Sequence, residues 1–462
     1  MRYEIKIPDT EYRQLQDALW ARPGIESAAF MLAGVRRTAT GVMLLARRIV
    51  VIPDTQYAVR SSCRIELSTR AINGLAALCE ANGLIAVLAH SHPSDTPYSP
   101  SDDHGEARIA DSLWPFVPDK MLGSLLFTPE NVHGRVWTAQ SGAPVSIDKL
   151  SIVGRTISTI DLVDRKSSVP DSVLAHQPRQ ILAFGSAGQE AMSTMKVGVV
   201  GAGGTGSSVC EQLIRLGVKD LILVDYDELE ASNISRVYGS RYRDADRWTW
   251  LPKKIRTLKK VNVVAKYLCA IAPDAEIVPV VGSVTERGVA ERLLDRDVLF
   301  ACTDDHWGRS ILNQIAYQFL IPCLNVGISL KRDDGAIAHG VGNVQVLRPD
   351  TGCLWCGNYL SSDRIRAESL PESESAALLE EGYLDDINEP APSVISLTTT
   401  VASLAVTWFI QLATDFAGSD ANFSRQNYDF LTGEVRRGRI EPNPDCICAR
   451  VLGRGDLEPL PL

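Results

Sequence analysis

The chain has 462 residues, of which 45% are hydrophobic and 22% are charged, and its formal net charge is −9. This length allows two or three domains of ordinary size, each with its own apolar core. The negative charge argues against non-specific binding of nucleic acid, although the run from Arg236 to Lys266 is locally basic.

The N-terminal sequence, MRYEIKIPDTEYRQLQ, is charged from its second residue and lacks the apolar core of a secretory signal. We therefore expect a cytoplasmic protein, in which clustered cysteines bind metals more readily than they form disulfides. The one long uncharged run, residues 394–413, has the length of a membrane span. Its threonine, serine and glutamine residues favour a helix buried in a domain, so no membrane partner is expected.

Residues 1–140 alternate between predicted strands and helices, and one predicted strand ends in two histidines. In GLIAVLAHSHP the i, i+2 spacing of His90 and His92 places both imidazoles on one face of the strand. Asp102 follows in SPSDD. Two imidazoles and a carboxylate leave one tetrahedral zinc position open for water, which the metal acidifies. Glu26, in GIESAAF, is the candidate base that takes the proton of this water and passes it to a leaving amine.

This order of an early glutamate, H-x-H-P and S-x-x-D resembles the JAB/MPN (JAMM) metalloproteases. The resemblance implies an α/β metalloprotease domain over residues 1–140 with a catalytic zinc, and it implies that Ser99 stabilises the oxyanion. A second register would place Asp103 on the metal and Pro100 at the serine position. Asp102 is preferred because it keeps both functional groups. Solvated histidines at a strand end, or a metal-binding but inactive domain, remain as alternatives.

Residues 141–178 are mixed polar sequence ending in SVPDSVLAHQPRQ, which predicts a linker with an entry helix.

A glycine loop follows the strand VGVV at residue 200. Gly201, Gly203 and Gly206 form G-x-G-x-x-G, in which glycines let the backbone turn tightly and approach phosphates at the start of the next helix. Asp225 ends the following strand, where a carboxylate can bond a ribose hydroxyl. This pattern predicts nucleotide binding, and taken alone it fits an NAD or FAD dehydrogenase as well as an ATP enzyme.

The polar residues that come next favour ATP chemistry. Asp227, Asn233 and Arg236 stand close together in YDELEASNISRV, and an arginine with an amide can neutralise charge on the α-phosphate and a leaving pyrophosphate. Lys260 opens KVNVVAKYLCAIAPD. Asp304, at the end of the strand in DVLFACTDD, is placed to hold Mg²⁺.

Residues 179–462 resemble the ThiF/MoeB family, the adenylating core of ubiquitin-activating enzymes, through the glycine loop, VDYD, SNISRV, the lysine segment and CTDD. The resemblance implies a Rossmann-like, doubly wound domain that uses ATP and Mg²⁺ to adenylate the C-terminal glycine of a ubiquitin-like protein. It further implies a role for each matching residue: ribose contact by Asp225, phosphate contact by Asn233, Arg236 and Lys260, magnesium binding by Asp304, and donation of Arg179 to the partner's ATP across a homodimer. The segment between Arg236 and Lys260 is longer than usual in that family, so Lys253 or Lys254 could replace Lys260.

Four cysteines occur in two local pairs, Cys353 with Cys356 and Cys446 with Cys448. Four thiolates suit a closed, structural zinc site that ties the C-terminal segment to the domain. The second pair is C-x-C where C-x-x-C is more usual, so a missing ligand or free buried thiols are alternatives.

Residues 357–392, predicted to be a mobile crossover loop, contain no cysteine. Activating enzymes that form a thioester keep the acceptor cysteine there, so adenylation is better supported than thioester transfer. Either the activated carboxylate passes to another protein's thiol or a sulfur donor, or an unexpected cysteine such as Cys323 serves.

Together the two halves predict a bifunctional enzyme of a prokaryotic ubiquitin-like modification pathway, with antiviral defence as one hypothetical setting. One half would adenylate the modifier, and the other would cleave after its terminal glycine for maturation or deconjugation. A conjugating enzyme is a further expected partner. The alternative is a sulfur-carrier pathway, in which the protease trims a tail and the adenylate becomes a thiocarboxylate. A scaffold with decayed sites and a nicotinamide oxidoreductase are the remaining classes.

Overall fold

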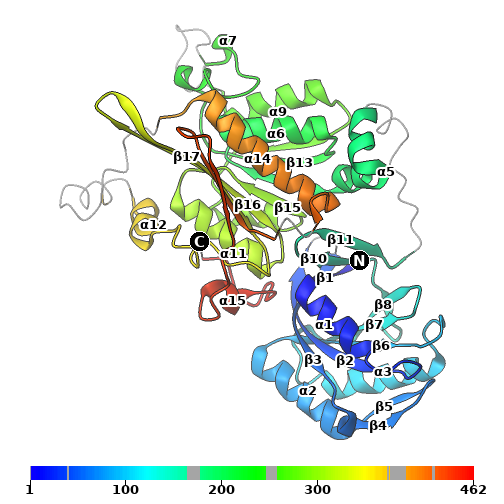
Figure 1. Ribbon diagram of the computed structural model, residues 1–462. Coiled ribbons are helices and arrows are strands. Elements are labelled where there is room, and N and C mark those ends of the chain that lie inside the picture. The colour runs from blue at the N-terminus through cyan, green and yellow to red at the C-terminus, as the bar shows by residue number, and fades with distance from the viewer. Residues whose placement is uncertain are drawn as a thin grey trace. The chain divides into compact units, whose positions relative to one another are not determined.

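The computed structural model describes residues 2–38, 41–163, 177–245, 258–371, 374, 392–418 and 422–461. The chain divides into two compact units, each built on its own sheet (Figure 1). Unit 1 comprises residues 1–167 together with 318–320 and 451–459, and unit 2 comprises the rest.

The described residues of unit 1 form a nine-stranded sheet in the order β11-β10-β1-β3-β2-β6-β7-β8-β9, with a separate pair, β4 and β5. Its elements are β1 (Arg2–Pro8), α1 (Asp9–Leu19), β2 (Ala28–Arg37), β3 (Gly41–Val51), η1 (Asp54–Gln56), β4 (Tyr57–Arg60), β5 (Ile65–Leu67), α2 (Thr69–Asn82), β6 (Ile85–Ser91), α3 (Pro100–Leu113), η2 (Pro118–Lys120), β7 (Met121–Phe127), β8 (Val132–Thr138), β9 (Val145–Ser146), β10 (Lys149–Val153) and β11 (Ile157–Asp161).

Helices cover both faces of this sheet. Successive side chains of β6 point to opposite faces. Ser91 donates a hydrogen bond to the carbonyl of Leu19 in α1, whereas the neighbouring His90 reaches Asp102 in α3. Helix α1 therefore packs on one face, and α3 packs on the other with α2 beside it. Strand β6 is buried along its whole length, which explains its continuous apolar sequence. The strand ends at the polar site.

The described residues of unit 2 form an eight-stranded sheet in the order β14-β13-β12-β15-β16-β17-β18-β19. Its elements are α5 (Pro178–Thr194), β12 (Lys196–Val200), α6 (Gly204–Leu216), β13 (Asp220–Val224), η3 (Ala231–Asn233), α7 (Tyr242–Ala245), α9 (Lys260–Ile271), β14 (Glu276–Val280), α10 (Arg287–Ala290), η4 (Glu291–Leu293), β15 (Val298–Ala301), α11 (His306–Gln318), β16 (Cys323–Asp333), β17 (Ala336–Leu347), α12 (Ser362–Ser369), α14 (Ile395–Thr414), β18 (Arg425–Asp429), β19 (Val435–Gly438) and α15 (Ile447–Val451).

Strands β14, β13, β12, β15 and β16 are parallel, and the chain changes direction across the sheet between β12 and β15. From β12 the chain runs through α6 to β13 on one side, whereas from β15 it runs through α11 to β16 on the other. Right-handed connections in opposite directions place α6 and α11 on opposite faces. The sheet is thus doubly wound, and its switch point lies at the carboxyl ends of β12 and β15.

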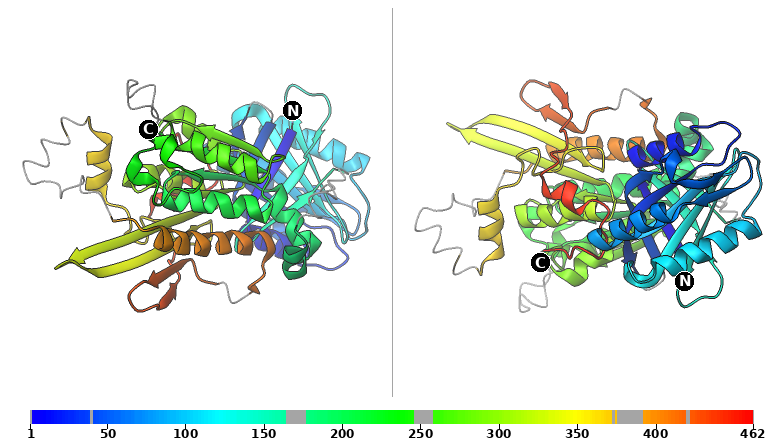
Figure 2. Two further views of the ribbon diagram at one scale, coloured as in Figure 1. Left: turned by 90° about the horizontal axis from the view of Figure 1, so that it is seen from above. Right: turned by 90° about the horizontal axis from the view of Figure 1, so that it is seen from below.

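Helix α14, the apolar run of residues 395–414, lies along α6 in unit 2 (Figure 1). It is long and apolar enough to cross a membrane, but half of its most apolar window is buried, among other residues Val401, Ala405 and Phe409. Helix α14 is therefore partly buried within unit 2, as the threonine, serine and glutamine residues of this run predict. Strands β16 and β17 continue as a long ribbon beyond the parallel part of the sheet, which Figure 2 shows in yellow-green.

The structure corrects the predicted linker over residues 141–178. Residues 145–161 form β9, β10 and β11, and β10 pairs in parallel with β1. The alternation of apolar residues in KLSIV and ISTID is too short to separate a strand from polar linker sequence, and the pairing with β1 decides the structure. In the predicted crossover loop, residues 362–369 form α12, whose first turn is capped by Ser361, and residues 375–391 lie outside the described part.

The C-terminal segment 451–459 also differs from the prediction, since it belongs to unit 1 and not to the adenylation domain. Asp456 accepts a hydrogen bond from the backbone N–H of Arg37 at 2.9 Å. A Cβ atom on Gly34 would lie 2.3 Å from the carbonyl oxygen of Gly453. Glycine at residue 34 therefore lets the backbone of this segment, called the C-terminal tail below, lie directly on β2.

Candidate functional site

The glycine loop joins β12 to α6 at the switch point of unit 2. Gly201 has φ +100°, in the left-handed region that favours glycine. A Cβ atom on Gly206 would lie 1.7 Å from the carbonyl oxygen of Gly201, so only glycine lets α6 begin this close to β12. Gly203 is the N-cap residue of α6. The free N–H groups of the first turn of α6 therefore lie at this edge, where a phosphate is attracted.

Asp225 follows β13 and borders the loop. Its Oδ2 accepts a hydrogen bond from the N–H of Ala202 at 2.6 Å, and its Oδ1 accepts one from the N–H of Asp227 at 2.7 Å. Burial raises the pKa of Asp225, against the lowering effect of these two bonds and of Lys260. The carboxylate is thus fixed beside the loop, at the end of the second strand.

Lys260 is the first residue of α9 and lies 2.6 Å, Nζ to Oδ2, from Asp227. Its backbone N–H also donates to the carbonyl of Asp227 at 3.0 Å. The structure therefore holds Lys260 against the acidic segment that follows β13. Lys253 and Lys254, the alternative phosphate ligands, lie outside the described residues.

Asn233 and Arg236 lie in and after the short helix η3. Asn233 is buried, and its Oδ1 accepts the N–H of Glu230 at 3.2 Å. Arg236 Nη1 donates to the carbonyl of Ser232 at 2.9 Å, and its Cβ and Cγ would lie 3.3 Å from a Cβ atom placed on Gly204. The arginine side chain thus passes over the first turn of α6.

Asp304 and Asp305 follow β15 and have different surroundings. Asp305 accepts hydrogen bonds from the hydroxyl of Thr303 and from the N–H of Gly308, which caps α11. Asp304 is exposed, and no hydrogen bond from the described residues engages its carboxylate.

The acidic residues gather around Tyr226. Burial, followed by the charges of Asp227, Asp305, Asp304 and Asp225, raises the pKa of Tyr226 to about 12. The carboxyl ends of β13 and β15 therefore bring their acids to one edge, with oxygen ligands of the kind that Mg²⁺ prefers.

Two arginines complete the description of this edge. Arg309, to which sequence reasoning assigned no role, is buried and donates to the carbonyl of Val326 at 3.2 Å and to Asn325. It ties α11 to β16, and its Nη2 donates to the carbonyl of Thr303, next to Asp304, at 2.5 Å. The only sequence signal for this role of Arg309 is its position shortly after Asp304 in DDHWGR. Arg179 is exposed in the first turn of α5, and no hydrogen bond or ion pair joins its side chain to another of the described residues.

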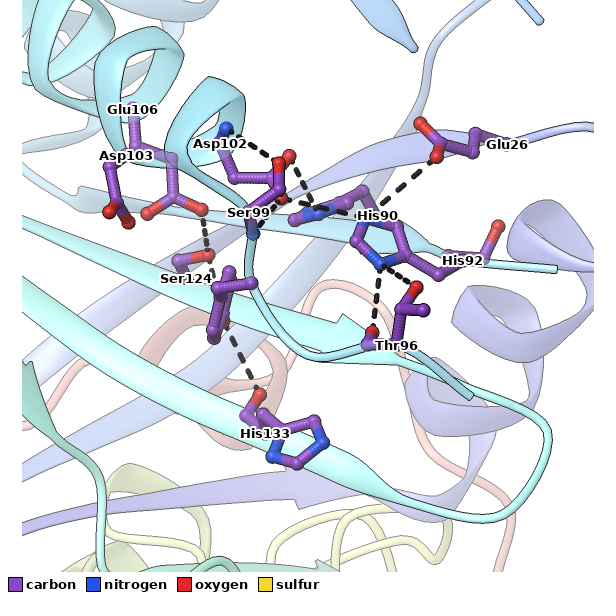
Figure 3. Close-up of polar contacts among 12 residues, drawn as sticks. Glu26, His90, His92, Thr96, Ser99, Asp102, Asp103, Glu106, Ser124 and His133 are labelled. Atoms are coloured by element: carbon purple, nitrogen blue, oxygen red, sulfur yellow. Dashed lines mark hydrogen bonds and ion pairs between the residues drawn. The ribbon is translucent and has the colours of Figure 1, made fainter. Parts of the chain in front are cut away.

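The second constellation lies in unit 1, where β6 and α3 bring His90, His92 and Asp102 together (Figure 3). Their ligand atoms all lie within 4.8 Å of one another. Each histidine Nε2 lies 3.6 Å from an oxygen of Asp102. Ligands about 2.0 Å from a tetrahedral zinc ion lie about 3.3 Å apart, so this set fits zinc after small adjustments.

Hydrogen bonding distinguishes the two histidines. His92 Nδ1 lies 2.9 Å from the carbonyl oxygen of Thr96, which fixes the tautomer with its lone pair on Nε2, toward Asp102. Both ring nitrogens of His90 are buried and have no hydrogen-bond partner in the described part of the chain. Burial lowers the pKa of His90 to about 4, so its imidazole is neutral at pH 7. A buried neutral imidazole with an unused lone pair is suited to ligate a metal.

Asp102 is oriented by Ser99, the N-cap residue of α3. The Ser99 hydroxyl donates to Asp102 Oδ2 at 2.7 Å, and the N–H of Ser99 donates to the same atom at 2.7 Å. Burial opposes ionisation of Asp102, but His90 and these bonds bring its pKa below the ordinary value. Asp103, the alternative ligand, points away and pairs with Arg135 at 2.5 Å.

Glu26 enters the same site from the start of β2. Its Oε1 lies 3.8 Å from His92 Nε2, and burial raises its pKa. The β4–β5 pair holds the backbone here, since the N–H of Glu26 donates to Ser61 at 2.9 Å and Arg60 Nε donates to the carbonyl of Glu26 at 3.1 Å. Sequence reasoning missed Arg60, because nothing along the chain connects it to residue 26.

The four paired cysteines also meet. The Sγ atom of Cys353 lies 3.7 Å from that of Cys356 and 3.5 Å from that of Cys446, and Cys356 lies 3.7 Å from Cys448. Thiolates about 2.3 Å from a tetrahedral zinc lie about 3.8 Å apart, so the C-x-C pair fits without a missing ligand. Hydrogen bonds from the other thiols, first from Cys448, lower the pKa of Cys353 to about 5.

Comparison with known proteins assigns unit 2. Residues 177–448 match the ThiF family, and because this span exceeds half of the chain, the protein belongs to that family. Ubiquitin-like modifier-activating enzyme 5 of Aedes aegypti is 26% identical over 270 residues, which are 56% of this chain and 59% of that protein. The Drosophila melanogaster enzyme is 26% identical over 264 residues, 54% of this chain and 56% of that protein. The chain thus matches somewhat over half the length of these relatives.

Solved structures of Escherichia coli MccB are also similar. MccB with ATP has 15% identity and a TM-score of 0.46, covering 59% of this chain and 74% of that chain. MccB in complex with N-formylated MccA has 15% identity and a TM-score of 0.47, covering 61% of this chain and 77% of that chain.

Proposed function

We propose that unit 2 uses ATP and Mg²⁺ to adenylate the C-terminal glycine of a ubiquitin-like protein. The glycine loop bordered by Asp225 carries this proposal, because it combines a phosphate-binding helix start with a carboxylate for ribose at the switch point of a ThiF-family domain. A nicotinamide oxidoreductase would use the same loop but not the polar residues after β13.

In the proposed reaction, an oxygen of the glycine carboxylate attacks the α-phosphorus of ATP. The bond between the α-phosphorus and the bridging oxygen breaks, and pyrophosphate leaves with that electron pair. Arg236, over the first turn of α6, and Lys260 stabilise the negative charge on the phosphates, while Asn233 supports the segment that carries Arg236. Asp304 would hold Mg²⁺, which shields the leaving pyrophosphate.

The fate of the adenylate follows from residues 357–392, which contain no cysteine. We propose transfer to a thiol of another protein, such as a conjugating enzyme. In the sulfur-carrier alternative, a sulfur donor converts the adenylate to a thiocarboxylate. Detection of a reducible adduct on this chain would contradict both and would point to an unexpected cysteine such as Cys323.

Intact mass spectrometry of a diglycine-ending ubiquitin-like protein, incubated with the chain, Mg²⁺ and ATP, tests adenylation. The expected product is the modifier with the added mass of AMP. An unchanged modifier, together with oxidation of NADH or reduction of NAD by the chain, would select the oxidoreductase.

For unit 1 we propose zinc-dependent hydrolysis after the same glycine, as in JAB/MPN metalloproteases. The cluster of His90, His92 and Asp102 with Glu26 beside it supports this second activity. Zinc on three protein ligands would acidify a water molecule in the remaining position. Glu26, whose Oε1 lies 3.8 Å from His92 Nε2, would accept the proton and return it to the leaving amine. The Ser99 hydroxyl, which donates to Asp102 in this structure, would stabilise the oxyanion after turning toward it.

A modifier with residues added after its diglycine tests this hydrolase. We expect zinc-dependent trimming to the glycine, and about 100-fold slower trimming by Glu26→Gln, because a positioned general base contributes roughly 10²- to 10⁴-fold. Full trimming by Glu26→Gln would contradict the role of Glu26.

We further propose a homodimer through unit 2 in the cytosol. In this dimer Arg179, which is exposed in the first turn of α5, would reach the ATP of the partner copy.

A further inference from the structure

We propose that Tyr98 is a positioning residue that holds the metal ligand His90 by ring packing, in place of the hydrogen bond that a metal-bound histidine ordinarily makes. This inference rests on the proposed zinc site. It names a residue outside the metal ligands and outside the motifs of the sequence.

The need for such a residue follows from the difference between the two histidines. A metal-ligating histidine almost always donates its second ring N–H to an acceptor, which fixes the ring. The carbonyl oxygen of Thr96 does this for His92 at 2.9 Å. His90 has no such acceptor among the described residues, although both its nitrogens are buried. Ring packing is therefore the contact by which the described residues can orient it.

Tyr98 supplies that packing from the segment before α3. The ring centroids of Tyr98 and His90 lie 5.9 Å apart with an interplanar angle of 58°, which is a favourable aromatic arrangement. The guanidinium carbon of Arg135 lies 3.6 Å from the centre of the same ring. The tyrosine ring is thus in contact with both a cation and the histidine.

A buried network fixes the far side of this stack. The Tyr98 hydroxyl lies 3.1 Å from Ser124 Oγ, and Ser124 donates to Glu106 Oε1 at 2.6 Å. Glu106 Oε2 accepts from Arg135 Nε at 2.8 Å and from Trp137 Nε1 at 2.7 Å.

The same network reaches the third metal ligand. Glu106 lies one helical turn after Asp102 in α3, so the bonds to Glu106 also fix the helix that carries Asp102. Arg135 in addition pairs with Asp103, which turns that carboxylate away from the metal. The stack of His90, Tyr98 and Arg135 and the anchoring of α3 are therefore parts of one support.

Zinc affinity of the full chain tests the proposal, measured by competition with a chromophoric chelator. Because the four-cysteine cluster also fits a zinc ion, His90→Ala defines the signal that belongs to that cluster alone. Relative to wild type, we expect Tyr98→Leu to weaken the remaining, unit 1 site by about 10-fold or more, as loss of an outer-shell partner does. Tyr98→Phe keeps the ring, and Ser124→Ala removes only a hydroxyl. In both variants the zinc affinity of the unit 1 site should stay within about twofold of wild type.

The visible spectrum of bound Co²⁺ gives a readout that general destabilisation would not change. Tyr98→Leu should alter the ligand-field bands of the His90 site, and Tyr98→Phe should not. Thermal unfolding of the metal-free variants checks folding, and Tyr98→Met, whose unbranched side chain adapts to irregular gaps, replaces Tyr98→Leu if that variant does not fold.

Unchanged zinc affinity in Tyr98→Leu or Tyr98→Met would overturn the proposal, and so would an equal loss in Tyr98→Phe, because the hydroxyl would then be the essential group. If wild type and His90→Ala bound zinc equally, the zinc site itself would be wrong, and the inference would fall with it.

Discussion

At the scale of single residues, the two glycines at the start of α6 have different tasks. A Cβ atom at residue 206 would collide with the carbonyl oxygen of Gly201, whereas one at residue 203 would meet nothing within 4 Å. Gly206→Ala should therefore destabilise unit 2 by about 1–3 kcal/mol, the usual cost of overpacking. Gly203→Ala should destabilise unit 2 by only roughly 0.5 kcal/mol, since alanine is a poorer N-cap than glycine. It should weaken binding of ATP, because the second glycine of such a loop lets the backbone approach the phosphates.

Differential scanning calorimetry and titration with a non-hydrolysable ATP analogue measure the two effects. Equal loss of stability in both variants would show that the close approach of α6 to β12 does not depend on residue 206.

At the scale of elements, glycines allow the backbone of the C-terminal tail to lie directly on β2. Gly34→Ala would place a Cβ atom 2.3 Å from the carbonyl oxygen of Gly453, so the tail must move away. We expect trypsin to cleave the variant after Arg454 at least about 10-fold faster than wild type, because local opening limits cleavage. The matched control is Gly74→Ala in α2, where a Cβ atom meets nothing within 4 Å. Equal cleavage of Gly34→Ala and wild type would mean that the tail is already detached in solution.

The four-cysteine cluster joins β17 and α12 to the segment that leads into α15. Cys448→Ser should remove one zinc ion per chain and lower the thermal midpoint of unit 2, since a structural zinc contributes directly to folding free energy. Elemental analysis of the purified chain measures the zinc. Wild type should contain two zinc ions per chain, and Cys448→Ser and His90→Ala one each. A content of two in Cys448→Ser would exclude the cysteine site.

The elements also show which features of the candidate sites can be predicted from the sequence. H-x-H at a strand end, S-x-x-D at a helix start and G-x-G-x-x-G between strand and helix are local patterns. In the structure His90 lies in β6 with His92 just after it, Asp102 lies in the first turn of α3, and the glycine loop joins β12 to α6. Arg135 and Glu106 lie 29 residues apart and meet only because β7 and β8 pair beside α3. Contacts between residues so far apart leave no pattern in the sequence. The residues that support the candidate zinc site could therefore not be predicted.

At the scale of the whole molecule, boundaries were harder to predict than domains. The doubly wound class of unit 2 was implied by the resemblance of its glycine loop and the motifs after it to the ThiF/MoeB family. Strands β9 to β11 and the C-terminal tail were assigned to the wrong part, because each is short, and β10 and the tail become regular only by pairing or packing with residues more than 100 positions away.

The central claim is that one chain carries two separate activities on the same glycine. Asp304→Ala, which alters only the edge of unit 2, and Glu26→Gln, which alters only the site of unit 1, test it most directly, each assayed for modifier-dependent ATP–pyrophosphate exchange and for trimming of a tail-extended modifier. We predict that Asp304→Ala loses exchange by roughly 100-fold or more and keeps trimming, while Glu26→Gln loses trimming and keeps exchange. Loss of both activities in either variant, with the fold intact, would contradict the account.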